Sequence, residues 1–228
     1  MGPRARRPTM TSAREEILGR IRAAKQDLDL PPVEVDWVYG RTTGDPVHRD
    51  HAQVVDLFVE RVEDYQAVVD RAGAAEVPGR VVAALQRYGA TSVVLPAGLP
   101  DDVVAAIRDA GVEVREDDHL SPAQLDEIGA VVTTSAVGFA ETGTIVLDHG
   151  SGQGRRALTL VPDIHVCLVR ADQVTTDVPE GLAREVDSIR AGQPQTWISG
   201  PSATSDIELS RVEGVHGPRT LHVIVSEG

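Results

Sequence analysis

The sequence predicts an α/β protein in which helices flank a mostly parallel sheet, with a helical extension at the N-terminus. Short β-branched runs alternate with helical patterns between residues 66 and 130, as expected of βαβ units. The 228 residues are 41% hydrophobic, which is enough for one sizeable core. We therefore expect one α/β domain over residues 66–228, preceded by a tail and helical extension over residues 1–65.

The N-terminal extension opens with a basic stretch that contains proline. Residues 1–9 read as a tail, and Met10 is an alternative start, so the sequence leaves open whether the tail belongs to the native protein. Apolar residues recur at helical spacing over residues 11–28, and the Leu-Pro-Pro sequence at residues 30–32 ends that pattern. A second amphipathic helix is predicted over residues 50–65.

The first elements of the main domain alternate between strand and helix. The expected order is strand 67–69, helix 77–88, strand 92–95, helix 101–110, strand 112–115 and a helix opened by Ser121 and Pro122. Ligands of parallel sheets bind beyond the carboxyl ends of the strands. A ligand site is therefore expected at that edge.

The alternation breaks at Ala130. Residues 130–135 and 144–148 both read as strands, with too few residues between them for a crossover helix, so residues 137–143 should form a turn or hairpin-like excursion. The elements expected after it are strands at 157–160, 165–170 and 221–225 and a helix at 179–190. A helix should also follow the turn at residues 199–202, because Ser205 and Glu208 have the spacing of a capping box.

The bend at residues 141–144 is the first candidate site segment. Gly143 lets the backbone approach a ligand closely, and Thr142 and Thr144 offer hydroxyl groups. Glu141 is the best candidate for an acid, base or nucleophile. A solvated turn residue is an equally good interpretation of Glu141 until its burial is known.

The second candidate segment runs from Ser151 to Arg156. Gly152 and Gly154 with Arg155 and Arg156 can wrap a phosphate or a carboxylate. The segment is not a P-loop, because the Gly-Lys-Ser/Thr ending is absent. A flexible connection fits the same residues.

The third candidate segment surrounds the predicted helix start near residue 204. Gly200, Pro201, Ser202, Thr204 and Asp206 would line the N-terminal end of a helix, which is a natural seat for an anion. Simple capping of that helix is the competing interpretation. We expect the three segments to surround one pocket, with His216 as a further member.

Two scarce residue types exclude several cofactors. Cys167 is the single cysteine and lies in an apolar run, so this chain alone forms no disulfide, cysteine-ligated zinc site or iron-sulfur cluster. Lys25 is the single lysine and lies far from every motif, which argues against Schiff-base and pyridoxal-phosphate chemistry. We expect no cofactor bound by this chain.

Histidines offer little evidence of a metal site. His48 and His51 have a spacing that suits metal ligands, but no third ligand lies nearby, and exposed histidines at a helix start are the favoured interpretation. His165 leads an apolar run and reads as a structural histidine. No metal is therefore expected.

The charge distribution argues against polyanionic partners. The chain has 22 basic and 35 acidic residues, and residues 26–228 hold 15 basic against 33 acidic. Such a body should repel nucleic acid and anionic membrane surfaces. Neither a signal-peptide core nor a membrane-spanning run is evident, so we expect a soluble, cytoplasmic protein without membrane insertion.

Three motifs in order carry a resemblance to a known family. The sequences A-E-T-G-T-I-V-L, S-G-P-S-A-T-S-D-I-E and V-E-G-V-H-G-P-R-T-L-H-V-I resemble the lactate utilization protein C family, over roughly residues 75–228. The resemblance implies a LUD domain similar to the sugar-phosphate isomerase and CoA-transferase fold. It also implies a cytoplasmic accessory subunit that works beside iron-sulfur partner proteins in the oxidation of L-lactate to pyruvate.

Two other functions stay open beside the accessory role. A free-standing enzyme acting on a CoA ester or phosphorylated metabolite would use Glu141 as the reacting carboxylate, as related CoA-transferase folds use a glutamate. The arginines at 155 and 156 would then clamp the anion. A ligand-sensing module would use the same pocket for a small anionic metabolite without chemistry.

Overall fold

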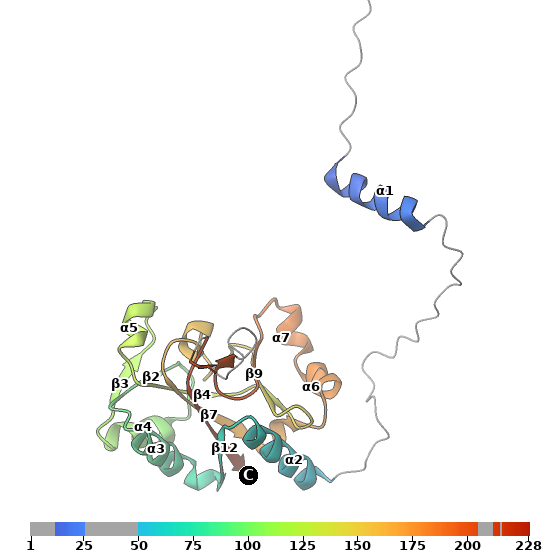
Figure 1. Ribbon diagram of the computed structural model, residues 1–228. Coiled ribbons are helices and arrows are strands. Elements are labelled where there is room, and N and C mark those ends of the chain that lie inside the picture. The colour runs from blue at the N-terminus through green and yellow to red at the C-terminus, as the bar shows by residue number, and fades with distance from the viewer. Residues whose placement is uncertain (1–11, 26–49, 205–211, 215) are drawn as a thin grey trace, which may run out of the picture. The chain divides into compact units, whose positions relative to one another are not determined.

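The computed structural model describes residues 12–25, 50–204, 212–214 and 216–228 (Figure 1). The chain divides into two compact units, residues 1–38 and 39–228. The first unit contains helix α1 (Ala13–Lys25). Its N-terminus is capped by Ser12, whose backbone N–H donates to the Glu15 carboxylate over 2.9 Å. The helix expected over residues 11–28 is confirmed over Ala13–Lys25, and residues 11 and 26–28 lie outside the described residues.

A six-stranded sheet forms the centre of the second unit, and every neighbouring pair of strands in it is parallel. Its strands, in spatial order, are β1 (Val68–Gly73), β12 (Thr220–Glu227), β7 (Ile164–Arg170), β4 (Ala130–Thr134), β2 (Ser92–Leu95) and β3 (Glu113–Glu116). The inner strands are buried along almost their whole length, as their continuous Val, Ile and Leu content requires. The predicted parallel α/β fold is confirmed.

Helices α3 (Val77–Arg87) and α4 (Asp101–Asp109) pack together on one face of this sheet (Figure 1). Leu85 and Ile107 are fully buried there against Val93 and Ile224. The short helix α5 (Pro122–Asp126) covers Val94 and Val131. Ser121 opens it, as expected from the sequence, and forms a capping box with Gln124. Local capping and apolar spacing therefore decide these helices.

Helix α2 (His51–Asp64) packs beside the same body, although the sequence division placed it in the N-terminal extension. Phe58 and Val62 are fully buried in one core with Val223 of β12. The expected boundary at residue 65 therefore does not coincide with the division between the compact units at residue 38.

A second, four-stranded sheet lies against the core of α2. Its order is β8 (Val174–Thr175), β5 (Val137–Phe139), β6 (Thr144–Leu147) and β9 (Thr196–Ile198). Strands β5 and β6 form an antiparallel hairpin with Val137 opposite Val146. The excursion expected over residues 137–143 is hairpin-like, but residues 137–139 are a strand and only residues 140–143 form the turn. Of the helices in the described part of the chain, none has the length and apolar character needed to cross a bilayer.

Two expected elements differ from the structure. Residues 157–160 were expected to form a strand, but η2 (Arg156–Thr159) is a 3₁₀ helix. Strand β7 already pairs with β4 and β12 on its two edges, so this short apolar run has no free edge beside β7 to join. The helix expected over residues 179–190 is divided at Glu185 into α6 (Val178–Arg184) and α7 (Val186–Arg190).

The remaining short elements complete the chain. They are η1 (Ala74–Glu76), η3 (Ala171–Gln173) and the two-stranded ladder of β10 (Ala203–Thr204) with β11 (Val212–Glu213). The turn at residues 199–202 thus leads into a strand. The capping box of Ser205 and Glu208 lies outside the described residues.

Candidate functional site

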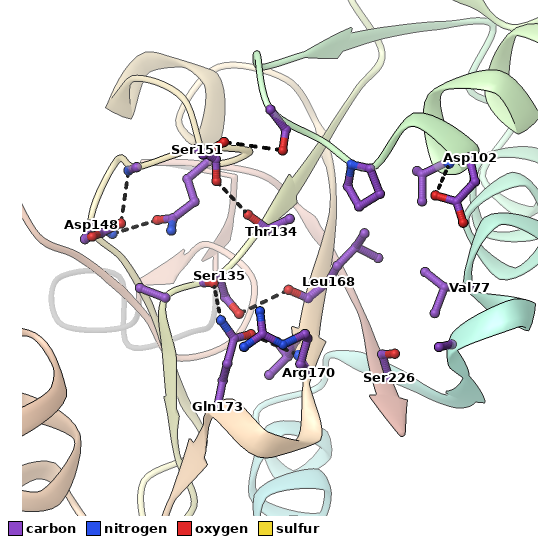
Figure 2. A pocket seen from close by; sticks show the side chains of 18 of the residues that line it. Val77, Asp102, Thr134, Ser135, Asp148, Ser151, Leu168, Arg170, Gln173 and Ser226 are labelled. Atoms are coloured by element: carbon purple, nitrogen blue, oxygen red, sulfur yellow. Dashed lines mark hydrogen bonds between the residues drawn. The ribbon is translucent and has the colours of Figure 1, made fainter. Parts of the chain in front are cut away.

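A cavity of about 720 Å³ opens where the strands of the main sheet end (Figure 2). Residues at or just after the carboxyl ends of five parallel strands line it: Ala74 after β1, Ser226 in β12, Arg170 in β7, Thr134 in β4 and Gly98 after β2. Val77 and Asp102 bring the first turns of α3 and α4 to the same opening. We call it the strand-end cavity, and it lies where the fold class predicts a ligand.

One wall of the strand-end cavity is a closed hydrogen-bond network. The Ser135 hydroxyl donates to the Leu168 carbonyl over 3.1 Å, and the Gln173 amide nitrogen donates to the Ser135 carbonyl over 3.0 Å. Gln173 also accepts from the Arg170 backbone N–H. Figure 2 shows these side chains grouped at the end of β7. Because their bonds are satisfied, this wall is rigid.

The opposite wall is the glycine-rich loop, residues 148–154. The Thr134 N–H donates to the Gly152 carbonyl, and the Gly152 N–H donates to the Ala97 carbonyl, each over 2.8 Å. A Cβ on Gly98 would lie 1.9 Å from the Ser151 hydroxyl oxygen, and Gly98 has a φ of +91°. Glycine is therefore required there to let the loop approach β2 and β4.

Side chains within the glycine-rich loop fix its shape. The buried Gln153 side chain accepts from the Asp148 N–H over 2.7 Å. The His149 ring has its Nδ1 2.7 Å from the Gly154 carbonyl and its Nε2 2.8 Å from the Thr196 hydroxyl. The carbonyl requires a proton on Nδ1, so Nε2 accepts from Thr196. The Asp148 side chain lines the strand-end cavity.

Glu185 brings a second carboxylate into this cavity, at the break between α6 and α7. Its side chain is buried, with the residue 6% exposed, and within the described residues its Oε2 has no hydrogen-bond partner. Burial raises the pKa of the Glu185 carboxyl, and the negative charge of Asp148 raises it further. Perturbed carboxyl groups of this kind gather at functional sites.

Sequence reasoning missed Glu185 and the other polar residues of the strand-end cavity. A signal was present, because Glu185 lies three positions after Leu182 and four before Ile189, on the inward stripe of the predicted helix. A charged residue on an inward stripe is rare unless it is paired or functional. The ends of β4 and β7 likewise pointed to Thr134 and Arg170.

The segment at residues 141–144 lies outside this cavity. Glu141 is exposed, and it lines a separate cavity of about 390 Å³ with Thr142, Arg61 and Tyr65. A Cβ on Gly143 would lie 2.6 Å from the Arg61 backbone carbon, so its close approach is to α2. Thr144 bonds to Ser199 over 2.9 Å, which joins this segment to the turn at residues 199–202.

The two arginines of the second segment point to different partners. Arg155 binds Asp117 through two nitrogens, at 2.7 and 2.8 Å, and also donates to the Leu120 carbonyl. This hydrogen-bonded pairing lowers the pKa of Asp117 and raises that of Arg155. The guanidinium expected to clamp an anion is thus held within the protein. Gly154 has a φ of +69° and packs on Leu158.

A third cavity, of about 280 Å³, contains most of the remaining candidates. Arg156, Gly200, Pro201, Ser202 and His216 line it, and the His216 N–H donates to the Ser202 hydroxyl over 3.0 Å. His165 and Leu221, near the amino ends of β7 and β12, complete it. Thr204 lies in β10, and Asp206 lies outside the described residues.

The structure does not bring the three segments around one pocket. Gly152 lies at the carboxyl ends of the strands, whereas Gly200 and His216 lie at the amino ends of the same parallel strands. The glycine-bearing turns follow elements that end at different ends of the sheet. The sequence pattern alone does not show at which end of the sheet each turn lies. Two links between segments are present: Arg156 of the second segment lines the third cavity together with the third segment, and the Thr144 hydroxyl bonds to Ser199 beside it.

His165 and Cys167 are buried within the core, and His51 bonds to the backbone. The His165 Nε2 lies 2.8 Å from the Thr133 hydroxyl, and burial lowers the pKa of His165 to about 4. Burial raises the pKa of the Cys167 thiol to about 12. His51 bonds to the Ala171 carbonyl, while His48 lies outside the described residues. Across residues 12–25, 50–204, 212–214 and 216–228, no three His, Cys, Asp or Glu side chains gather as a metal site.

Comparison with known proteins identifies the family. The family model of the LUD domain matches residues 12–226, nearly the whole chain. The chain belongs to the LUD domain family. The resemblance seen in the three sequence motifs is therefore confirmed. The strand-end cavity lies within this LUD domain, and the residues that build it fall between positions 74 and 226.

Two relatives cover most of this LUD domain. A Deinococcus radiodurans protein named lactate utilization protein C is 45% identical over 222 residues, which is 96% of this chain and 97% of the relative. A protein of the same name from Geobacillus sp. (strain WCH70) is 27% identical over 185 residues, 78% of this chain and 74% of the relative.

A solved structure supports the fold of the LUD domain. It is a DUF162 family protein from Deinococcus radiodurans, 43% identical, with a TM-score of 0.68. The match covers 78% of this chain and 99% of the solved chain. Identity of this level over a whole solved chain places the two proteins in one family as well as one fold.

Proposed function

We propose that this protein is a component of a cytoplasmic L-lactate utilization system. The observation that carries the proposal is the 45% identity, over almost the full length of both chains, to a protein named lactate utilization protein C. Within that system the chain acts as an accessory subunit in the oxidation of L-lactate to pyruvate. Its strand-end cavity holds a small metabolite, because that cavity lies where ligands of parallel sheets bind and is lined by buried polar groups.

Iron-sulfur partner proteins supply the redox centre in this proposal. The single cysteine, Cys167, is fully buried, and a thiol with a pKa near 12 is a poor source of the thiolate that metal clusters need. Residues 26–228 carry 15 basic and 33 acidic residues, so the body offers acidic surface for docking. Electron transfer therefore belongs to the partners.

A second candidate function is an enzyme that acts on a small metabolite in the strand-end cavity. Glu185 favours it, because a buried carboxylate at a cavity wall is the type of group that transfers protons. The clamp expected from Arg155 does not support it, since Asp117 occupies that guanidinium. A ligand-sensing role would use the same cavity without chemistry.

Gene deletion in the host tests the lactate proposal. Loss of this gene should abolish growth on L-lactate and leave growth on pyruvate normal, because the block precedes pyruvate. The wild-type gene should restore growth, and tagged protein should co-purify with iron-sulfur proteins while remaining colourless when isolated. Normal growth of the deletion strain on L-lactate would refute the proposal.

A further inference from the structure

A buried carboxylate oxygen without a partner lies at the wall of the strand-end cavity. Glu185 is 6% exposed, and within the described residues nothing donates a hydrogen bond to its Oε2. A buried polar atom left in this state lowers the stability of a fold. A ligand that enters the cavity can satisfy this atom, since Glu185 is one of the lining residues.

A second unpartnered acceptor, the Gln195 side-chain oxygen, belongs to the same region of the fold. The Gln195 amide nitrogen donates to Ser188 over 2.9 Å, and Ser188 follows Glu185 by three positions, on the same side of the helix. Gln195 directly precedes β9, whose Thr196 pairs with Leu147 of β6. Gln195 and Asp148 therefore lie next to each other at the same end of the β6–β9 strand pair.

The cavity carries negative charge where Asp148 and Glu185 line it. Asp148 is close enough to raise the pKa of Glu185, in addition to the larger effect of burial. Asp148 accepts from the Gly150 N–H, which leaves acceptor capacity on its carboxylate. The cavity arginine, Arg170, is paired with Asp172 at 2.9 Å. Within the described residues, Asp148 and Glu185 therefore bring negative charge to the cavity, while the arginine that lines it is already paired.

We propose that Asp148 and Glu185, which both line the strand-end cavity, form a subsite for a small cation there. The cation is a divalent metal ion or the protonated amine of a ligand, which share the same need for oxygen acceptors. A bare anion would meet two carboxylates there. An acidic metabolite would instead enter together with the cation. This inference rests on the proposed function, because the proposed function places the metabolite in this cavity.

Binding of two probes to the purified full chain tests the subsite. Mn²⁺ binding is followed by the loss of the free-ion signal in electron paramagnetic resonance, and ethylammonium binding by calorimetry. The wild-type protein should bind at least one probe, and that probe identifies the source of the positive charge. Glu185→Gln should weaken binding by about tenfold or more. The matched control is Asp187→Asn, because Asp187 is exposed and loses the same charge two residues away.

Thermal melting without either probe gives a second, independent measurement. Glu185→Gln should melt a few degrees above the wild type, because it removes a buried charge that lacks a partner, whereas Asp187→Asn should melt close to the wild type. The subsite is refuted if the wild type binds neither probe, or if both variants bind like the wild type. Normal growth of the deletion strain on L-lactate would refute the lactate proposal alone, because this binding is measured in purified protein.

Discussion

Arg155 and Asp117 form a two-nitrogen ion pair that ties the glycine-rich loop to the segment after β3. The Asp117 side chain is 10% exposed and that of Arg155 is 34% exposed, so water screens this pair only in part. The same guanidinium donates to the Leu120 carbonyl. These contacts hold the end of the glycine-rich loop in place, and they leave little of Arg155 for a ligand.

Replacing Arg155 should therefore affect stability more than ligand affinity. Arg155→Lys keeps the charge but loses the planar fork, and we expect it to lower the free energy of unfolding by about 2 kcal/mol. Urea unfolding measures the change. Arg156→Lys is the control, because Arg156 is exposed and should shift the midpoint by little. An unchanged midpoint for Arg155→Lys would contradict a structural role of the pair.

Acid should destabilise the fold through His165. Its pKa is about 4 in the folded protein against an ordinary value of 6.5, because burial disfavours the charged ring. Between these values the unfolded chain binds a proton that the folded chain does not. The stabilisation is therefore complete above pH 6.5 and is lost as the pH falls toward 4, by about 3 kcal/mol in total.

Urea unfolding at several pH values checks this dependence. His165→Gln should be less stable at neutral pH but should lose less stability between pH 6.5 and 4 than the wild type. Burial also lowers the pKa of His222, which acts in the same direction in both proteins, so the difference between them isolates His165. Parallel curves for wild type and His165→Gln would exclude this contribution.

Gly98 should tolerate no side chain while the glycine-rich loop stays in place. Gly98→Ala would put a Cβ 1.9 Å from the Ser151 hydroxyl oxygen, at a φ of +91°. Gly111→Ala has a similar φ of +77° but open space around it, so it should cost about 1 kcal/mol, the backbone penalty alone. Gly98→Ala should cost clearly more, as measured by thermal melting. Equal losses of stability in the two variants would show that the glycine-rich loop moves to accommodate the Cβ without further loss of stability.

The sequence predicted the main sheet because its evidence is local. The β-branched runs and the helix start at Ser121 and Pro122 each indicate an element within a few residues of themselves, and the short spacing before Thr144 likewise indicated the hairpin of the second sheet. The strand expected at residues 157–160 failed for a nonlocal reason. Both edges of β7 are already taken by β4 and β12, which no property of the run itself reveals.

The site was harder to predict, because its features arise from residues far apart in the chain. Arg155 meets Asp117 across 38 positions, and that contact decides whether an arginine is a clamp or a scaffold residue. The inward stripe of the predicted helix marked Glu185 as unusual, but the lack of a partner for its Oε2 follows from packing against distant residues. The expected ligand position beyond the strand ends was a property of the fold class, and the strand-end cavity lies there.

Glu141 should prove dispensable for catalysis or ligand binding. It is exposed at the bend after β5, and its contribution to the strand-end cavity is nil, since it lines the cavity beside α2. Glu141→Gln keeps the size and most hydrogen bonding of the side chain, so a deletion strain that carries this variant should grow on L-lactate like the wild type. Glu185→Gln in the same strain should slow that growth. Loss of activity by orders of magnitude in Glu141→Gln would instead identify Glu141 as the reacting carboxylate and move the active site to the α2 side of the hairpin.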